Sequence, residues 1–233
     1  PILEVGPGMG VLTQFLLPKE RTVKVVEVDY ESVAYLREAY PQLEDNIIED
    51  DFLKMNLQRL FDGQPFVLTG NYPYNISSQI FFKMLDNKEL IPCCTGMIQK
   101  EVAERMSAKP STKNYGAITV LCQYYTEQSI VANVPASLFV PPPKVDSAVL
   151  ELKVLDKPSV EVKDEGVFFR VVKAAFSQRR KTLLNCLSAN FAIPKDEIST
   201  LLESIGIAPS RRGETLSLEE FANIADTLLQ KIK

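Results

Sequence analysis

The residues with the clearest chemical potential are Asn71, Pro73 and Tyr74, which directly follow the short apolar run 65–70. That run is typical of a buried strand, so Asn71 is expected at the carboxyl end of a strand, where open α/β sheets bind ligands. The exocyclic amine of a nucleobase is a weak nucleophile until two acceptors take its hydrogens. The Asn71 amide oxygen and a backbone carbonyl beside Pro73 can be those acceptors, and Tyr74 can stack on the base. An ordinary strand-ending turn is the alternative, and it stays open at this point.

A glycine turn at the start of the chain is the second candidate element. Residues 1–5 form an apolar strand pattern, Gly6, Gly8 and Gly10 follow, and residues 11–17 have helical spacing. A strand, a glycine turn and a helix together favour nucleotide binding, because the backbone can approach the ligand closely. The G-x-G-x-G spacing differs from the G-x-G-x-x-G dinucleotide fingerprint, and a glycine turn alone is weak evidence.

Acidic residues close the next two predicted strands. Glu27 ends the strand 22–29 and lies 21 positions after Gly6, where a carboxylate can accept both ribose hydroxyls of an adenosine. The third predicted strand, 46–52, closes with Asp51 and Phe52. Asp51 could accept from an adenine amine, with Phe52 packing near that ring. Three adjacent carboxylates at 49–51 could instead bind a metal, but consecutive strand residues point to opposite faces, so no metal site is predicted.

The rest of the chain supplies further elements. Helical patterns cover residues 31–40, 77–85, 100–106, 168–175, 194–205 and 217–232, and strand patterns cover 93–99, 118–121, 128–133 and 145–152. Phe139 precedes a rigid turn containing three prolines and could be a second stacking face for a base or an ordinary core residue. The charged segment 153–165 is a plausible linker, which predicts domains at residues 1–157 and 158–233.

Charge is unevenly distributed between the two predicted domains. The net charge is −4 overall; residues 1–157 carry 15 Lys+Arg against 20 Asp+Glu, whereas residues 158–233 carry 11 against 10. A protein that coats nucleic acid along its whole surface is therefore disfavoured. A local basic surface at Arg179, Arg180 and Lys181, with Arg211 and Arg212 nearby, could contact phosphates or could simply be solvated.

Composition narrows the remaining classes. The 233 residues contain no histidine, so a Ser-His-Asp triad and a histidine metal site are excluded. The four cysteines lack zinc-like spacing and are expected to be free thiols in a reducing cytosol. No apolar run approaches the ~20 residues of a membrane span. Because the chain opens inside a strand pattern, a preceding N-terminal piece is expected to be missing.

Several motifs together resemble one family. The glycine turn, Glu27, Asp51 and Asn71 have the order of a class I S-adenosylmethionine-dependent methyltransferase. Segments 2–13, 71–78 and 139–149 resemble, more narrowly, the ribosomal RNA adenine N6-dimethyltransferases, and segments 176–183 and 206–217 resemble their bacterial small-subunit branch. The resemblance covers essentially the whole chain.

The resemblance implies an α/β fold, in which a Rossmann-like methyltransferase domain precedes a small all-helical domain that binds RNA. It implies methyl transfer from S-adenosylmethionine, leaving S-adenosylhomocysteine, to N6 of two adjacent adenosines near the 3′ end of 16S rRNA. The expected setting is the immature 30S subunit in the cytoplasm, with a monomeric enzyme and no membrane. The implied residues are, for the cofactor, Gly6, Gly8, Glu27, Asp51, Phe52 and Asn71; for catalysis, Asn71, Pro73 and Tyr74; and for RNA, Tyr74, Phe139, Arg179, Arg180 and Lys181.

Two departures from the family pattern matter. The family usually carries a Gln-x-Phe-Leu-type segment before the first strand, and this sequence begins after that position; Tyr72 stands where leucine is common. Four alternatives are an inactive RNA-binding assembly factor, a 23S rRNA resistance methyltransferase, a DNA adenine methyltransferase and a dehydrogenase. The intact Asn71 motif and Glu27 disfavour an inactive assembly factor, and the Pro141–Pro143 pattern disfavours a 23S rRNA resistance methyltransferase. An Asn in place of Asp disfavours a DNA adenine methyltransferase, and the glycine spacing disfavours a dehydrogenase.

Overall fold

The structure, a computed structural model, describes residues 1–232 except for the side chain of Glu44. It divides into two compact units. Unit 1 comprises Pro1–Ala103 and Glu127–Val154, and unit 2 comprises Glu104–Thr126 and Leu155–Lys233. The boundary between the predicted domains 1–157 and 158–233 lies near Leu155, where unit 2 resumes, whereas the segment Glu104–Thr126, which the prediction gave to the first domain, belongs to unit 2.

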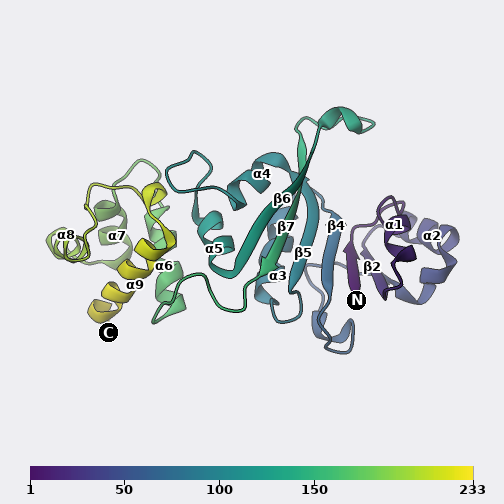
Figure 1. The fold of residues 1–233 in the computed structure, drawn as a ribbon, viewed down its shortest axis with the longest axis horizontal. Coiled ribbons are helices and arrows are strands. Elements are labelled where there is room, and N and C mark those ends of the chain that lie inside the picture. The colour runs from purple at the N-terminus through teal and green to yellow at the C-terminus, as the bar shows by residue number, and fades with distance from the viewer. Residues whose placement is uncertain (233) are drawn as a thin grey trace. The chain divides into compact units, whose positions relative to one another are not determined.

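Unit 1 is built on a seven-stranded sheet with the order β3-β2-β1-β4-β5-β7-β6 (Figure 1). The pairings from β3 through β5 are parallel, whereas β5 and β7 are antiparallel. The strands span β1 Ile2–Val5, β2 Val23–Glu27, β3 Ile47–Glu49, β4 Val67–Asn71, β5 Cys93–Gln99, β6 Thr126–Val134 and β7 Ser147–Val154.

The strand order changes direction at β1, because β2 and β3 lie on one side of it and β4 and β5 lie on the other. Ile2 pairs with Val23 of β2 and with Val67 of β4, so the carboxyl ends of all three strands lie at one edge of the sheet. In open α/β sheets, such a reversal leaves a crevice beyond the strand ends in which ligands bind. The topology therefore places the glycine turn, Glu27 and Asn71 together.

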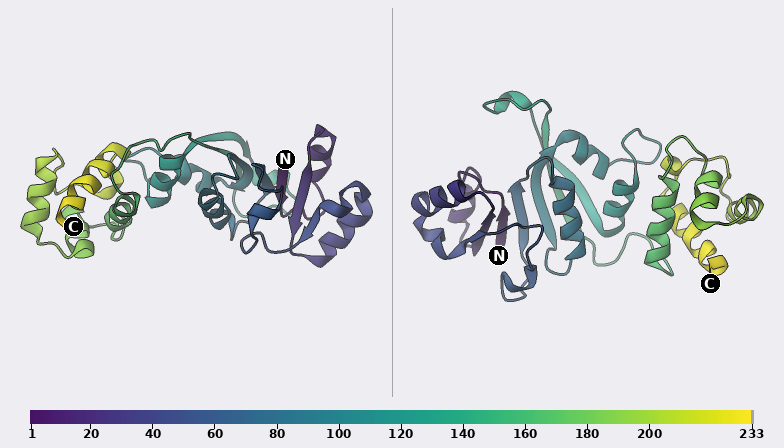
Figure 2. Two further views of the ribbon diagram at one scale, coloured as in Figure 1. Left: turned by 90° about the horizontal axis from the view of Figure 1, so that it is seen from below. Right: turned by 180° about the vertical axis from the view of Figure 1, so that it is seen from behind.

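Helices cover the sheet of unit 1 and make up most of unit 2. Helix α3 lies behind the strands in Figure 1 and in front of them in the right view of Figure 2. The connection between β6 and β7 runs out beyond the sheet and carries a short 3-10 turn. The α-helices span α1 Thr13–Leu16, α2 Tyr30–Ala39, α3 Ser77–Asp86, α4 Lys100–Met106, α5 Ala117–Tyr125, α6 Glu165–Ala175, α7 Leu183–Phe191, α8 Lys195–Ser204 and α9 Leu218–Ile232.

Unit 2 has its own hydrophobic core, contributed by α5 and α6 through α9. Tyr124 stacks on Phe168 with ring centroids 4.8 Å apart, and its hydroxyl donates to Glu165. Phe221 of α9 and Phe176 lie 5.9 Å apart across the same core. A continuous core of this kind keeps the helices of unit 2, and the residues on their surface, in fixed positions.

The strand predicted at residues 118–121 is wrong, because these residues belong to helix α5. The β-branched side chains of Ile118, Thr119 and Val120 favour a strand locally. In the structure, Thr119 accepts from the backbone N–H of Gly116 and donates to the carbonyl of Arg105, which secures the first helical turn. Burial of Val120 and Tyr124 on one face then completes the helix, so tertiary packing outweighs local propensity.

Candidate active site

The glycine turn after β1 adopts backbone conformations that only glycine tolerates easily. Gly6 and Gly8 have φ values of 67° and 52°. A methyl group added at Gly8 would meet no atom within 4 Å, so open space lies beside the backbone there. The amide of Gly6 donates to the carbonyl of Val26 at 3.0 Å, which ties the turn to β2. The turn is therefore a fixed and accessible cradle.

Glu27 joins β2 to that cradle. It is 8% exposed, and its Oε2 accepts from the amide of Gly8 at 3.0 Å. Its Oε1 accepts from the amides of Val28 and Asp29 at 2.9 and 3.0 Å. A carboxylate held by three backbone donors has a fixed orientation, and its remaining lone pairs are positioned to accept from a ligand's hydroxyl groups.

Asn71 is the last residue of β4, and its side chain is exposed and makes no hydrogen bond within the described residues. The next residue, Tyr72, donates its backbone N–H to Met97 at 3.1 Å, whereas its carbonyl has no donor among the described residues. The carbonyl of Pro73 already accepts from Ile76. The two available acceptors are therefore the Asn71 amide oxygen and the Tyr72 carbonyl, which is the carbonyl that precedes the proline.

The Asn71 motif and the glycine turn lie next to each other. A methyl group added at Gly6 would lie 3.9 Å from Cδ of Pro73. Pro73 is exposed, and the Tyr74 ring is half-buried. The Tyr74 hydroxyl is 2.6 Å from Oγ of Ser147, a fully buried residue at the start of β7. This hydrogen bond fixes the Tyr74 ring, although the two residues are 73 positions apart in the sequence.

Asp51 and Phe52 lie in the turn after β3. Oδ1 of Asp51 accepts from the amide of Leu53 at 2.9 Å, and Lys54 pairs with Oδ2 at 3.1 Å. The Lys54 ammonium is the main cause of the lowered pKa of Asp51, so the group remains a carboxylate. Phe52 is buried, with Nζ of Lys83 lying 5.4 Å from its ring centroid.

The remaining predicted residues lie apart from this cluster. Phe139 is partly exposed on the connection between β6 and β7, and no described contact links it to Asn71. In unit 2, Arg179 and Arg180 line a pocket of about 270 Å³, and Lys181 is not part of its lining. The other lining residues are Ser111, Thr112, Lys113, Arg212 and Glu214. Four cations against one carboxylate make this pocket suitable for an anion.

Arg211 and Arg212, considered together in the sequence, have different environments. Arg211 forms a bidentate ion pair with Glu220 and donates to Thr215, so its charge is used within unit 2. Arg212 lines the basic pocket. Only the second arginine is therefore available to an outside ligand through this pocket.

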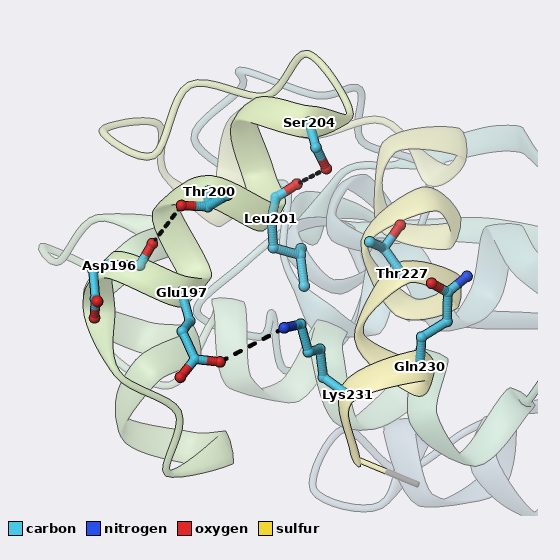
Figure 3. A pocket seen from close by; sticks show the side chains of 8 residues that line it. All are labelled: Asp196, Glu197, Thr200, Leu201, Ser204, Thr227, Gln230 and Lys231. Atoms are coloured by element: carbon cyan, nitrogen blue, oxygen red, sulfur yellow. Dashed lines mark hydrogen bonds and ion pairs between the residues drawn. The ribbon is translucent and has the colours of Figure 1, made fainter.

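A larger groove of about 520 Å³ lies between α8 and α9 of unit 2 and contains none of the predicted site residues (Figure 3). Lys231 reaches across it toward Glu197 at 3.8 Å. Within the described residues, no group of three or more metal-binding side chains is present, and no helix is long and apolar enough to span a membrane.

The residues at the strand ends fit a ligand that contains adenosine. The open space beside Gly8, the fixed carboxylate of Glu27 and the carboxylate of Asp51 follow three neighbouring strands, β1, β2 and β3. Backbone approach at a glycine turn and carboxylate recognition of ribose are the features that adenosine binding requires.

Comparison with known proteins decides the family. The profile of the family "Ribosomal RNA adenine dimethylase" matches residues 1–230. This chain belongs to that family. The ribosomal RNA small subunit methyltransferase A of Bacteroides fragilis is 60% identical over 233 residues, which cover all of this chain and 83% of that protein. The protein of the same name from Bacillus mycoides is 43% identical, over 97% of this chain and 81% of that protein.

Solved structures of a dimethyladenosine transferase and of an rRNA methyltransferase share the fold. A dimethyladenosine transferase from Plasmodium falciparum aligns with a TM-score of 0.77 and 28% identity, over 96% of this chain and 87% of that one. The 23S rRNA methyltransferase ErmE aligns with a TM-score of 0.73 and 27% identity, over 99% and 91%. The chain is thus an S-adenosylmethionine-dependent rRNA adenine dimethyltransferase with a Rossmann-like domain and a helical C-terminal region, as the sequence predicted.

Sequence reasoning missed several residues that support the site. Ser147, which anchors Tyr74, lay within a quoted motif, but nothing showed its partner. Lys83 donates to the carbonyls of Leu53 and Met55 at 2.9 and 2.7 Å, and the sequence held no signal for this contact. Lys113 joins the basic pocket from the connection between α4 and α5.

Proposed function

We propose that this adenine dimethylase modifies two adjacent adenosines near the 3′ end of 16S rRNA, in the immature 30S subunit, as a cytoplasmic monomer. The observation that carries the proposal is the pair of unengaged acceptors, the Asn71 amide and the Tyr72 carbonyl, beside the glycine turn. The small-subunit assignment is supported by the 60% identity to a small subunit methyltransferase A, against 27% to a 23S rRNA enzyme.

Four residues would hold S-adenosylmethionine. The backbone of Gly6 and Gly8 leaves room for close approach, Glu27 would accept from the ribose hydroxyls, and Asp51 would accept from the adenine amine. The buried ring of Phe52 would support the turn that presents Asp51. When bound, this cofactor supplies a methyl group already activated by its sulfonium.

The target base would be held by the Asn71 motif. Two acceptors, Oδ1 of Asn71 and the carbonyl of Tyr72, would take the two N6 hydrogens and turn the nitrogen lone pair outward. Tyr74, fixed by Ser147, would stack on one face of the base, and Phe139 would offer a second stacking face. Pro73 would keep the two acceptors at a fixed separation, because its ring restricts the backbone.

No strong base is required in this scheme. The chain contains no histidine, and Asn71 is neutral at every working pH, so it aligns the amine rather than deprotonating it. The proton that leaves the methylated amine would pass to water, since Asn71 and Pro73 are exposed. In the second transfer only one N6 hydrogen remains, so one of the two acceptors would take it, and the first methyl group would need room beside the acceptors.

The basic pocket of unit 2 would bind phosphates of the rRNA. Lys113, Arg179, Arg180 and Arg212 surround it, and Lys181 would add charge beside it. The Arg179 guanidinium donates to the carbonyl of Lys113 at 3.3 Å, which orders two of the four cations relative to each other. Lysine and arginine at a concave surface suit RNA backbone binding without sequence readout.

Methyl transfer to ribosomal subunits tests the proposal. Labelled S-adenosylmethionine is supplied with 30S subunits that lack adenine dimethylation, and subunits already dimethylated serve as the control. Label recovered as N6,N6-dimethyladenosine from the unmethylated subunits alone is the expected result. Tight binding of the protein to both kinds of subunit without transfer would contradict it and would favour a non-catalytic assembly factor.

A further inference from the structure

The side chain of Tyr72 lies between two exposed residues of the active site but is itself 2% exposed. Asn71 and Pro73 face the ligand space on either side, while the Tyr72 ring points into the protein. Its hydroxyl lies 3.2 Å from Sγ of Cys94 and 3.5 Å from the carbonyl of Thr95. Phe81 of α3 meets the ring edge-on, with centroids 5.8 Å apart.

Two glycines make the space that this ring occupies. Gly70 of β4 and Gly96 of β5 are direct partners in the parallel ladder. A methyl group added at Gly96 would lie 2.6 Å from Cδ2 of Tyr72 and closer still to Cε2, and one added at Gly70 would lie 2.8 Å from Cε1. Side-chain atoms in real structures do not approach so closely, so any residue with a Cβ at position 96 is incompatible with this position of the Tyr72 ring.

The ring controls the backbone that carries the two acceptors. Asn71 is covalently attached to Tyr72, and the second acceptor is the carbonyl of Tyr72 itself. Since the backbone N–H of Tyr72 is held by Met97, the ring, the N–H and the hydroxyl fix one residue at three points. A shift of the ring would therefore move both acceptors together, and small misplacements of catalytic groups cost large factors in rate.

We propose that Tyr72 is a positioning residue for methyl transfer, and that the Gly70–Gly96 slot is its required complement. This inference rests on the proposed role of the Asn71 motif. Leucine is shorter than tyrosine and lacks the hydroxyl, so a leucine at position 72 would not need the full depth of the slot. The tyrosine and Gly96 thus form a matched pair in this chain, and Cys94 supplies the anchor at the far end.

A double-mutant cycle tests the pair through rate rather than stability. In Gly96→Ala, we expect kcat for 30S methylation to fall at least about tenfold, while the Kd for S-adenosylhomocysteine and the KM for 30S change less than about twofold. In Gly96→Ala combined with Tyr72→Leu, we expect kcat to return to within about threefold of the unmodified enzyme. Tyr72→Phe, which removes only the hydroxyl and its contacts with Cys94 and Thr95, should lower kcat by about two- to fivefold.

Val33→Ala is the matched control, because Val33 is equally buried but lies in α2, outside the site. It should lower the melting temperature and leave kcat unchanged. Equal loss of kcat in Gly96→Ala and in the double variant would overturn the inference, and so would an unchanged kcat in Gly96→Ala. If Gly96→Ala does not fold, an unchanged kcat in Tyr72→Phe overturns it instead. An unmodified enzyme that methylates no 30S would refute the proposed function, whereas an active enzyme with an additive cycle would refute only the positioning role.

Discussion

At the scale of single residues, the site depends on a neutral amide rather than an acid. Asn71 is exposed, unpaired within the described residues, and next to a carbonyl that is equally unpaired. An amide oxygen can accept a hydrogen from an amine without becoming protonated, so its function does not vary with pH. The chemistry therefore depends on where Asn71 and Tyr72 are held.

Replacing Asn71 with Ala should lower kcat by roughly 10²–10³-fold, the range seen when one preorganised hydrogen-bonding group is removed from an active site. The Kd for S-adenosylhomocysteine should rise by no more than about threefold, because the glycine turn and Glu27 remain. Single-turnover methylation and calorimetric titration measure the two quantities. Parallel losses in rate and affinity would show that Asn71 serves mainly the cofactor.

Glu4 is a buried carboxyl on β1, the strand that leads into the glycine turn. It is 1% exposed, and burial raises its pKa to about 7, although the Thr13 hydroxyl donates to it at 2.7 Å and partly offsets that effect. Nearby Glu27 contributes to the raised pKa. The folded protein therefore holds a proton on Glu4 at pH values where the unfolded chain has lost it.

The sign of the resulting pH dependence is fixed. Below about pH 4.5 both states are protonated and Glu4 makes no difference; between 4.5 and 7 the unfolded state releases its proton first, so stability falls with rising pH. Above about pH 7, burial of the ionised Glu4 carboxylate lowers the free energy of unfolding by its full amount, about 3 kcal/mol. Glu4→Gln should therefore be more stable than the unmodified protein at pH 8, with a smaller difference at pH 5.5. Urea unfolding at both pH values measures this, and a gap that does not shrink at pH 5.5 would contradict it.

Residue types and spacing were enough to predict that Gly6, Glu27 and Asn71 lie at strand ends, because each ends a strand or directly follows one and needs only local sequence to be found. The supports of the site could not be predicted in this way. Ser147 contacts Tyr74 from 73 positions away, and Cys94 contacts Tyr72 from 22 positions away. Such contacts depend on strand order, which single-sequence patterns do not determine.

At the scale of elements, α3 and the turn after β3 are joined by one lysine. Lys83 donates to the carbonyls of Leu53 and Met55, and desolvation by burial lowers its pKa from the ordinary lysine value. The turn that carries Asp51 is thus attached to a helix rather than left as a free loop.

Lys83→Met should raise the Kd for S-adenosylhomocysteine by about tenfold, since the turn loses both carbonyl contacts while its apolar packing is kept. The value of kcat at saturating cofactor should change far less. Lys19→Met removes the same charge from an exposed position and is the control. Equal effects of the two variants would mean that net charge, and not the anchored turn, controls affinity.

Most strands and helices follow from the hydrophobic period, and β5 and α4 lie at the predicted residues 93–99 and 100–106. The failure at α5 has a physical cause, since Thr119 makes two side-chain contacts that stabilise a helix start. For the same reason, the segment Glu104–Thr126 could not be assigned to unit 2 from sequence, because its partners lie beyond residue 155.

At the scale of the whole molecule, positive charge collects in one unit. Unit 2 holds 15 Lys+Arg and 12 Asp+Glu, a net of +3, whereas unit 1 holds 11 and 18, a net of −7. Although the whole chain has a net negative charge, unit 2 has a net positive charge and contains the pocket lined by Arg180 and Arg212. An acidic sheet unit and a basic helical unit suit an enzyme that binds RNA through a limited part of its surface.

Arg180→Gln and Arg212→Gln should each weaken 30S binding and reduce the slope of log affinity against log salt by about one, as expected when one phosphate contact is lost. Lys195→Gln, at the start of α8 and outside the pocket, is the control and should leave the slope unchanged. Filter binding across a salt series measures the slopes. Identical slopes for all three variants and the unmodified enzyme would remove the pocket from the RNA interface.

The most direct test of the account is a competition between the two subunits in one reaction. Undermethylated 30S and 50S subunits are supplied in equal amounts with S-adenosylmethionine, and nuclease digests of both rRNAs are sequenced by mass spectrometry. The account predicts two adjacent N6,N6-dimethyladenosines near the 3′ end of 16S rRNA and no change in 23S rRNA. Dimethylation of 23S rRNA, or of a single isolated adenosine, would contradict it.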